Sequence, residues 1–274
     1  MPNRYPIVAG MFYPADRLSC LREVEDCLRE AGTPRVQGTI YGGIVPHAGW
    51  TFSGPTAARV FAALRAQNAT PETIILFGAV HSWGVHQPSM YGSGQWITPL
   101  GPLSIDEELA QALLEAQVPH LINSPRAHAE EHSLEVQLPF IKYLFPDVTI
   151  LPIAVPPFQG ADELGREIAR VVRALGRQAP AIGSSDLTHY GPRYGITPAG
   201  LGEPALQWAK ENDRRILDLM VELRAAEIVP EASTRHNACG AGAIAAAIGY
   251  AKELGARQGV LLHYTTSYDV MPTG

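Results

Sequence analysis

Three residues with metal-binding side chains stand next to predicted strands or a predicted helix. His47 follows a strand that ends at Val45, His81 follows the strand at 73–77, and Cys239 comes directly before a helix. The carboxyl ends of parallel strands meet at one edge of a sheet, where α/β proteins bind ligands. Two imidazoles and one anionic ligand can hold a divalent ion and leave positions open for substrate or oxygen. We therefore expect a metal site made of His47, His81 and Cys239.

Two further polar residues follow the next predicted strand. Asp186 and His189 lie in the segment Ser-Ser-Asp-Leu-Thr-His-Tyr-Gly, which begins at Ser184. Either side chain can orient a metal ligand or move a proton. The start of a helix favours the thiolate form of a cysteine, which is the form that ligates. By spacing alone, a histidine satisfied by hydrogen bonds and a cysteine that only packs fit the same pattern.

A second motif offers a different site. His128-Ala-Glu-Glu-His132 matches the H-x-x-E-H pattern of inverted zinc peptidases. On a helix both histidines would share a face, with Glu131 as base and a distant carboxylate such as Glu203 to complete the site. Against this, the apolar helical pattern becomes clear only after residue 133. A polar loop that leads into a helix is the alternative.

Aromatic residues flank the expected pocket. Trp50 and Tyr190 lie close in sequence to His47 and His189. They can form an apolar wall for a small, aromatic substrate, or they can belong to the core. Both interpretations stay open at this point.

The elements that must position these residues alternate between strand and helix patterns. This alternation favours a single α/β domain over residues 1–274, with a mostly parallel or mixed sheet flanked by helices. Residues 89–104 suggest an antiparallel excursion, and the first helix is expected between a cap at Asp16 and a stop at Gly32. The other helices are expected at 55–67, 106–117, 133–145 (despite Pro139), 162–175, 203–226 and 239–254, and the strands at 39–45, 73–77, 148–155, 179–184 and 260–268.

Composition limits the partners and the location. The 274 residues are 46% apolar and 18% charged, with a net charge of −6 and no basic block, so we expect no nucleic-acid partner. No signal peptide or membrane span is expected. Three cysteines are too few for a disulfide scaffold and suit a reducing compartment, so the predicted location is cytoplasmic.

Several segments, in one order along nearly the whole chain, resemble the Memo family, whose microbial members are called AmmeMemoRadiSam system protein B. They include Pro46-His47-Ala48-Gly49-Trp50 with its continuation to Gly54, the Ser184 segment, and Cys239-Gly240. The other matching residues are 8–14 (VAGMFYP), His81, 131–140 (EHSLEVQLPF) and Tyr268.

This resemblance implies a LigB-like fold, similar to class III extradiol ring-cleaving dioxygenases. It implies that His47, His81 and Cys239 occupy the metal-ligand positions and His189 the place of the acid/base histidine. It makes residues 128–132 the start of a family helix segment, with His132 near the pocket.

The expected function is a non-haem iron(II) oxidoreductase that acts on a small substrate. Asp186 would support His189, and Trp50, His132 and Tyr190 would bind the substrate. Because a thiolate replaces the usual carboxylate, copper or zinc are alternative metals. The resemblance also implies radical-SAM and AMMECR-type partner proteins. A non-catalytic module that binds a peptide or protein in the same pocket is the alternative function.

Overall fold

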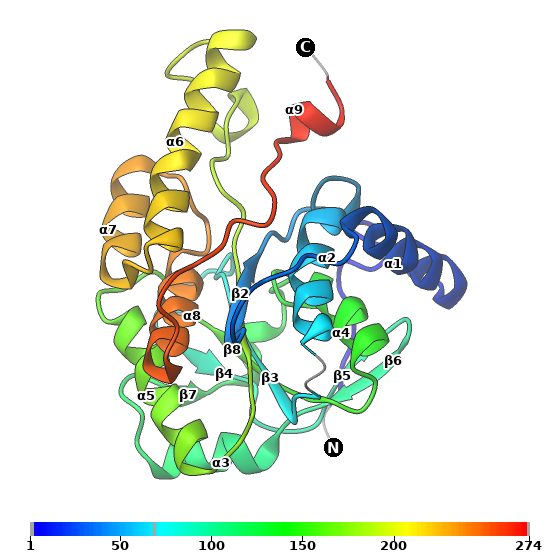
Figure 1. Ribbon diagram of the computed structural model, residues 1–274, viewed down its shortest axis with the longest axis vertical. Helices are drawn as coiled ribbons and strands as arrows, with labels where there is room; N and C mark the ends of the chain where they lie inside the picture. The colour runs from blue at the N-terminus through cyan, green and yellow to red at the C-terminus, as the bar shows by residue number, and fades with distance from the viewer. Residues whose placement is uncertain (1–2, 68–69, 273–274) are drawn as a thin grey trace.

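The computed structural model describes residues 3–67 and 70–272. Its centre is a six-stranded sheet in which four neighbouring strands are parallel and the edge strand pair reverses direction (Figure 1). The order is β2 (Gly42–Val45), β9 (Ala181–Ser184), β3 (Thr73–Gly78), β8 (Thr149–Ala154), β4 (Ser89–Met90) and β7 (Ile122–Asn123). The predicted α/β class with a mixed sheet flanked by helices is thus confirmed.

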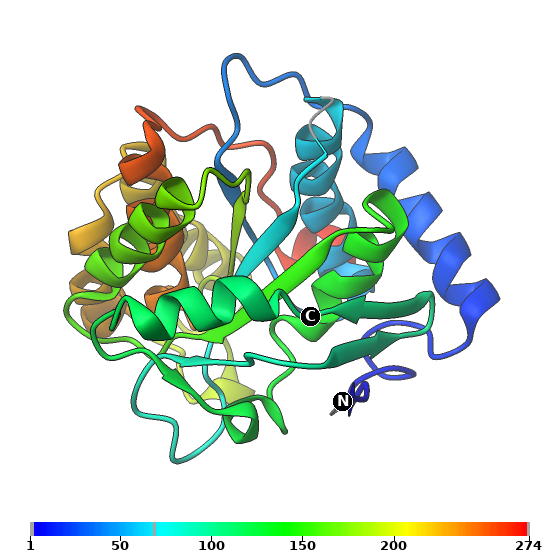
Figure 2. The ribbon, with the colours of Figure 1, turned by 90° about the horizontal axis from the view of Figure 1, so that it is seen from below.

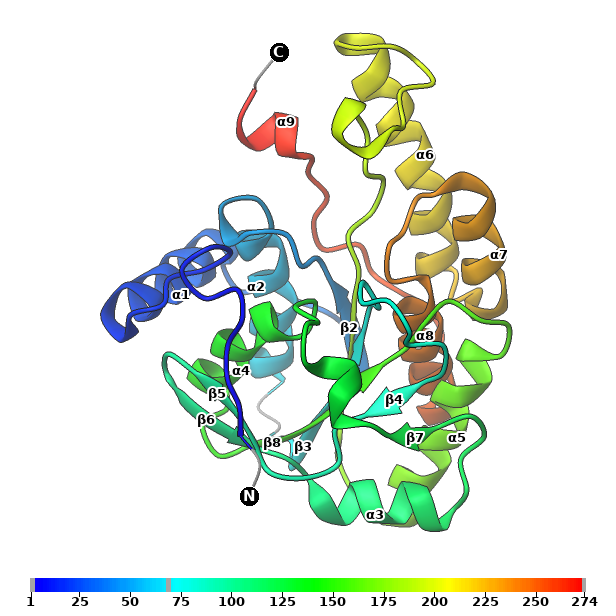
Figure 3. The same cartoon turned by 180° about the vertical axis from the view of Figure 1, so that it is seen from behind.

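Helices cover both faces of this sheet (Figure 2). The strands β3 and β8 are almost wholly buried, as their runs of apolar residues predict for strands covered on both sides. One face carries α1 (Arg17–Ala31), α2 (Trp50–Ala66) and α4 (Leu138–Leu144), and the other carries α5 (Ala161–Ala174), α7 (Ala225–Arg235) and α8 (Ala241–Leu254). At the periphery lie α3 (Glu107–Glu115), α6 (Glu203–Val221) and α9 (Ser267–Val270) (Figure 3).

A second, three-stranded sheet lies beside α4. It joins β1 (Asn3–Arg4), β5 (Gln95–Thr98) and β6 (Gly101–Ser104), and β5 and β6 form an antiparallel hairpin. The antiparallel excursion expected at 89–104 is therefore present. The expected cap and stop of the first helix are also correct: the Asp16 side chain accepts from the Ser19 amide, and Gly32 has a φ of 64°.

Three element predictions need correction. The segment 260–268 forms no strand; most of it has no regular secondary structure, and α9 begins at Ser267. The long helix expected within 203–226 is present as α6, which ends at Val221 before a separate helix, α7. The helix expected at 133–145 begins only at Leu138, because Pro139 is tolerated in a first turn and not farther inside. The helix expected from residue 55 already begins at Trp50.

Three short 3-10 turns complete the fold: η1 (Pro125–His128), η2 (Glu135–Gln137) and η3 (Pro192–Tyr194). Among the helices within the described ranges, none is both long enough and apolar enough to cross a membrane.

Candidate metal centre

His47 lies just beyond the carboxyl end of β2, fully surrounded by protein. Its Nδ1 is 2.9 Å from the Ser184 hydroxyl at the end of β9. That hydroxyl donates its own hydrogen to the Ser133 carbonyl at 2.8 Å, so it can only accept from the ring. The neutral ring of His47 therefore carries its proton on Nδ1, which makes Nε2 the nitrogen that can ligate.

His81 follows β3 and is held by Glu131. The Glu131 carboxylate accepts from the His81 amide at 2.7 Å and lies 3.1 Å from its Nδ1. Burial would raise the pKa of this carboxyl, but the hydrogen bonds from His81 and Ser133 lower it to about 2, so it stays ionised. Since an ionised carboxylate only accepts, His81 donates through Nδ1 and presents Nε2. The His81 side chain is 34% exposed, so this side of the centre is open.

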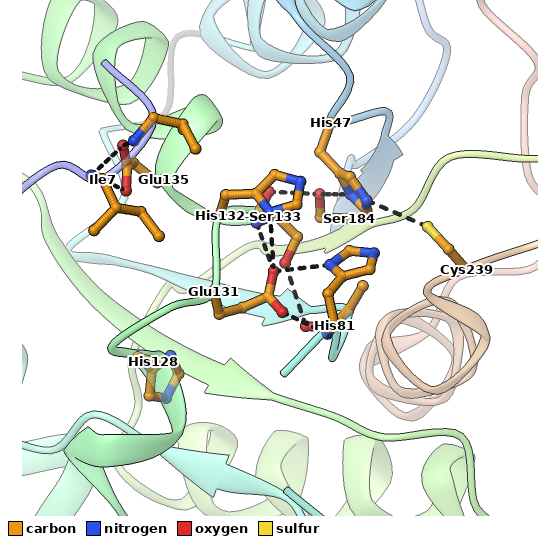
Figure 4. A network of polar contacts seen from close by, with 12 residues as sticks. Ile7, His47, His81, His128, Glu131, His132, Ser133, Glu135, Ser184 and Cys239 are labelled. Atoms are coloured by element: carbon orange, nitrogen blue, oxygen red, sulfur yellow. Dashed lines mark hydrogen bonds and ion pairs between the residues drawn. The ribbon is translucent and has the colours of Figure 1, made fainter. Parts of the chain in front are cut away.

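His132 completes a cluster of three imidazoles (Figure 4). Its ring stacks on His81 with centroids 4.9 Å apart and meets the edge of His47 at 5.7 Å. One possible ligand atom from each of the three histidines lies within 4.8 Å of the others. Burial and the charge of His47 lower the pKa of His132 to about 4, so this ring is neutral at pH 7.

Cys239 reaches the cluster from the turn before α8. Its Sγ lies 3.2 Å from His47 Nε2 and accepts from the Asp186 amide at 3.3 Å. Burial raises the pKa of this thiol, but hydrogen bonds from His47 and His81 outweigh burial and lower it to about 6. The same contacts raise the pKa of His81 to about 10 against the opposing effect of burial. This lowered pKa favours the thiolate form of Cys239 at neutral pH.

This set of donors fits a divalent transition metal. Imidazole nitrogens and a thiolate are the ligands that iron, copper and zinc accept, and each of two rings is held from behind by a hydrogen bond, as ligating histidines usually are. The pKa values of His47 and His81, which lie beside the thiolate, are raised. A bound metal ion would replace the protons that these rings hold in its absence.

Asp186 connects two of these loops. Its Oδ1 accepts from the amides of His47 at 2.7 Å and Ala48 at 3.3 Å, while its carbonyl accepts from the Cys239 amide at 3.2 Å. The side chain therefore positions ligands. His189 packs on Tyr194 with ring centroids 4.9 Å apart, and within the described chain no hydrogen bond joins it to the cluster. Both Asp186 and His189 line a large neighbouring cavity.

The two aromatic residues expected to form a wall of the pocket lie in different places. Trp50 is buried in the core, packs on Tyr13 and Phe140, and donates from Nε1 to the Val136 carbonyl at 3.0 Å. The structure thus places Trp50 in the core, away from a ligand surface. Tyr190 is half-buried and lines the same cavity as Asp186, although its hydroxyl is already bonded to Gly200.

The zinc-peptidase interpretation is wrong. The segment 128–132 is not an α-helix: η1 ends at His128, and turns follow. His128 is buried, donates from Nε2 to the Ser89 carbonyl at 2.8 Å, and lies apart from the cluster. Burial lowers the pKa of His128 to about 4. His128 therefore lies in the core and His132 in the imidazole cluster, and Glu131 accepts a hydrogen bond from His81.

Several supporting residues were missed. Gln137 donates to the Pro46 carbonyl at 2.8 Å and so fixes the loop of His47. Glu135 is buried and accepts from the amides of Ile7 and Val8, which ties the N-terminal segment to the turn carrying His132. The density of polar residues between 131 and 137 was the available signal for these roles.

A family model and several relatives match nearly the whole chain. A family model described as Memo-like protein matches residues 4–273. Proteins described as MEMO1 family proteins are 38% identical in Thermococcus onnurineus and 37% identical in Pyrococcus abyssi, in each case over 97% of this chain and 94% of the relative. The Methanopyrus kandleri relative is 37% identical over 98% of this chain and 93% of its own. A crystal structure of uncharacterized protein JW3007 from Escherichia coli K12 covers 70% of this chain and 80% of its own, with 15% identity and a TM-score of 0.47.

Proposed function

We propose, from the premise that this chain belongs to the Memo-like protein family, that it is a metal-dependent oxidoreductase of the dioxygenase-like type. Iron(II) is the proposed metal, and His47, His81 and Cys239 are its proposed ligands. The observation that carries the proposal is the cluster of oriented imidazoles that includes His47 and His81, at the carboxyl ends of β2 and β3, with the Cys239 sulfur 3.2 Å from His47 Nε2.

The proposed chemistry divides among the chain's own residues. Iron(II), when bound, supplies the one-electron chemistry that lets oxygen react with an organic substrate. Ser184 and Glu131 keep the ligating rings in place, and Asp186 keeps the loops of His47 and Cys239 together. These contacts fix the geometry before a substrate arrives.

Proton transfer is assigned to two other histidines. The neutral ring of His132 stands against His81 and can accept a hydrogen bond or a proton from a substrate hydroxyl at a ring nitrogen. His189, at the wall of the adjoining cavity, is the proposed acid/base on the other side of Asp186. Tyr190 lines the same wall and is a proposed substrate contact.

The test is iron content combined with oxygen uptake in anaerobically purified protein. We expect about one iron per chain in the wild type and oxygen uptake with a member of a catechol series. Cys239→Ser should lose both, whereas Cys27→Ala, which removes a buried thiol in α1, should keep both. Wild-type protein that takes up neither iron, copper nor zinc would contradict the proposal and favour the non-catalytic binding module.

Two further assignments belong to the same proposal. The three cysteines are free, which suits a reducing, cytoplasmic location. Radical-SAM and AMMECR-type proteins are proposed partners, tested by co-purification from a host that produces all three chains.

A further inference from the structure

A large cavity lies next to the histidine cluster. It has a volume of about 1060 Å³, and residues of β2, α2, α6 and the C-terminal segment 258–268 line it. That volume reaches the upper end of the range for small-molecule pockets, about 300–1,000 Å³. The cavity therefore has room for a molecule larger than a single ring.

The lining of this cavity contains few charged side chains, and those are acidic. Its described lining residues include two carboxylates, Asp186 and Asp213, and no lysine or arginine. Most of the rest are apolar or tyrosine, for example Leu187, Leu217 and Tyr264. An anion bound here would lose part of its hydration, find no lysine or arginine to pair with, and lie in the same cavity as the Asp186 carboxylate. Such a transfer is strongly unfavourable.

One polar spot interrupts the apolar wall. The Asp213 carboxyl, on α6, is buried and accepts from the Thr188 amide at 2.9 Å and from the Tyr264 hydroxyl at 2.7 Å. Burial raises the pKa of Asp213, which favours its neutral form. This pair joins the loop after β9 to the C-terminal segment and offers hydrogen-bonding atoms to a polar end group.

We propose that this cavity binds a mainly apolar small molecule, larger than a single ring and without negative charge, whose polar end lies at Asp213 and Tyr264. Its other end would lie towards Asp186, which lines the cavity and also holds His47 and Cys239. The binding itself needs no metal, since none of the three clustered histidines lines the cavity.

The test compares two fluorescent probes with the same aromatic body. N-phenyl-1-naphthylamine is neutral, and 8-anilinonaphthalene-1-sulfonate adds one negative charge. Titrated into metal-free protein, the neutral probe should saturate at one per chain and bind at least about 10-fold more tightly, a difference of about 1.4 kcal/mol. Equal or tighter binding of the sulfonate would overturn the proposal.

Two pairs of variants locate the probe. Ala209→Phe fills the cavity from α6 and should weaken binding of the neutral probe by about 10-fold, whereas Gln207→Phe adds the same ring to an exposed position that does not line it. Leu261→Arg places a cation at a half-exposed lining position and should raise sulfonate affinity, whereas Leu175→Arg, exposed and outside the lining, should not. Equal effects within both pairs would contradict the location.

A second copy of the chain is the other possible occupant. In that case the protein would sediment as a dimer, bind neither probe, and become monomeric in Ala209→Phe, and the proposal would be wrong. Because these measurements use metal-free protein, they are independent of the iron test. A protein that binds the neutral probe but no metal would keep this inference and lose the proposed oxidoreductase function.

Discussion

At the scale of single residues, the proposed metal centre depends on side chains that would not themselves bind the metal. His47 owes its free Nε2 to the Ser184 hydroxyl, and His81 owes its orientation to Glu131, which contacts both its ring and its amide. Partners of this kind fix the tautomer and raise the basicity of the ligating nitrogen. Removing them should weaken metal binding while the ligands themselves remain.

Glu131→Gln tests this dependence. The amide cannot supply a charged acceptor to both His81 groups, so we expect metal affinity to fall by about 10- to 100-fold, measured by competition with a chromophoric chelator. Glu130→Gln, at the exposed neighbouring position, should have no effect. Unchanged affinity in Glu131→Gln would show that the carboxylate does not orient the centre.

Substitutions of the two histidines in the H-x-x-E-H segment should have different effects. His128→Ala removes a buried ring and its bond to the Ser89 carbonyl, so we expect it to cost about 2–3 kcal/mol of stability and leave metal content unchanged. His132→Ala, which removes the proposed proton acceptor beside His81, should keep the metal content, lower oxygen uptake and cost less stability. Thermal unfolding, elemental analysis and oxygen uptake measure these effects. Metal loss in both His128→Ala and His132→Ala would return the peptidase interpretation.

Sequence could place His47, His81 and Cys239 because strand ends and a helix start are visible in local patterns. It could not place their supports, because Glu131 is 50 residues from His81 and Ser184 is 137 residues from His47. Such pairs exist only once the sheet order is known. The choice between a cavity wall and the core stayed open for Trp50 for the same reason: the structure shows that the first turn of α2 faces the core there, next to Tyr13 and Phe140.

At the scale of elements, the insertion of β9 between β2 and β3 builds the centre. This arrangement brings the loop of Ser184 to Asp186 between the loops of His47 and His81. The alternating pattern predicted the parallel strands correctly, but their order is set by packing and cannot be read from any one segment. The segment 260–268 has strand-forming residues, yet among the described residues no ladder joins it to β2. Both instead line the large cavity.

Asp106 joins three elements and should give the stability a pH dependence. Its carboxylate caps α3 at the Leu109 amide, accepts from Thr73 of β3 and pairs with Arg177 after α5. Burial raises its pKa, but these partners lower it overall. A lowered carboxyl pKa stabilises the folded state at any pH above the pKa of the same group in the unfolded chain, about 4. This stabilisation is lost as the pH falls below about 4 and through the pKa of the folded state.

Asp106→Asn should therefore reduce the free energy of unfolding at pH 7 by about 1–3 kcal/mol and flatten its decline below about pH 4. Urea unfolding between pH 7 and pH 3 measures this. Glu108→Gln, which removes the exposed second partner of Arg177, should change stability by less than about 1 kcal/mol. A wild-type slope retained in Asp106→Asn would contradict the assignment.

At the scale of the whole molecule, the proposed ligands come from distant parts of the chain. His47 and His81 follow early strands, whereas Cys239 comes after β9, α6 and α7. The centre therefore forms only when the complete domain is folded, and a bound metal should stabilise the whole domain against unfolding. The large cavity shares Asp186 with this centre, so the two sites lie side by side in one architecture.

The central claim is that His47, His81 and the Cys239 thiolate hold one metal ion. Cobalt(II) is the most direct reporter, because a cobalt–thiolate bond gives an intense near-ultraviolet charge-transfer band. We expect this band in the wild type at one cobalt per chain, unchanged in Cys27→Ala and absent in Cys239→Ser. A band that persists in Cys239→Ser, or wild-type protein that binds cobalt without it, would contradict the account.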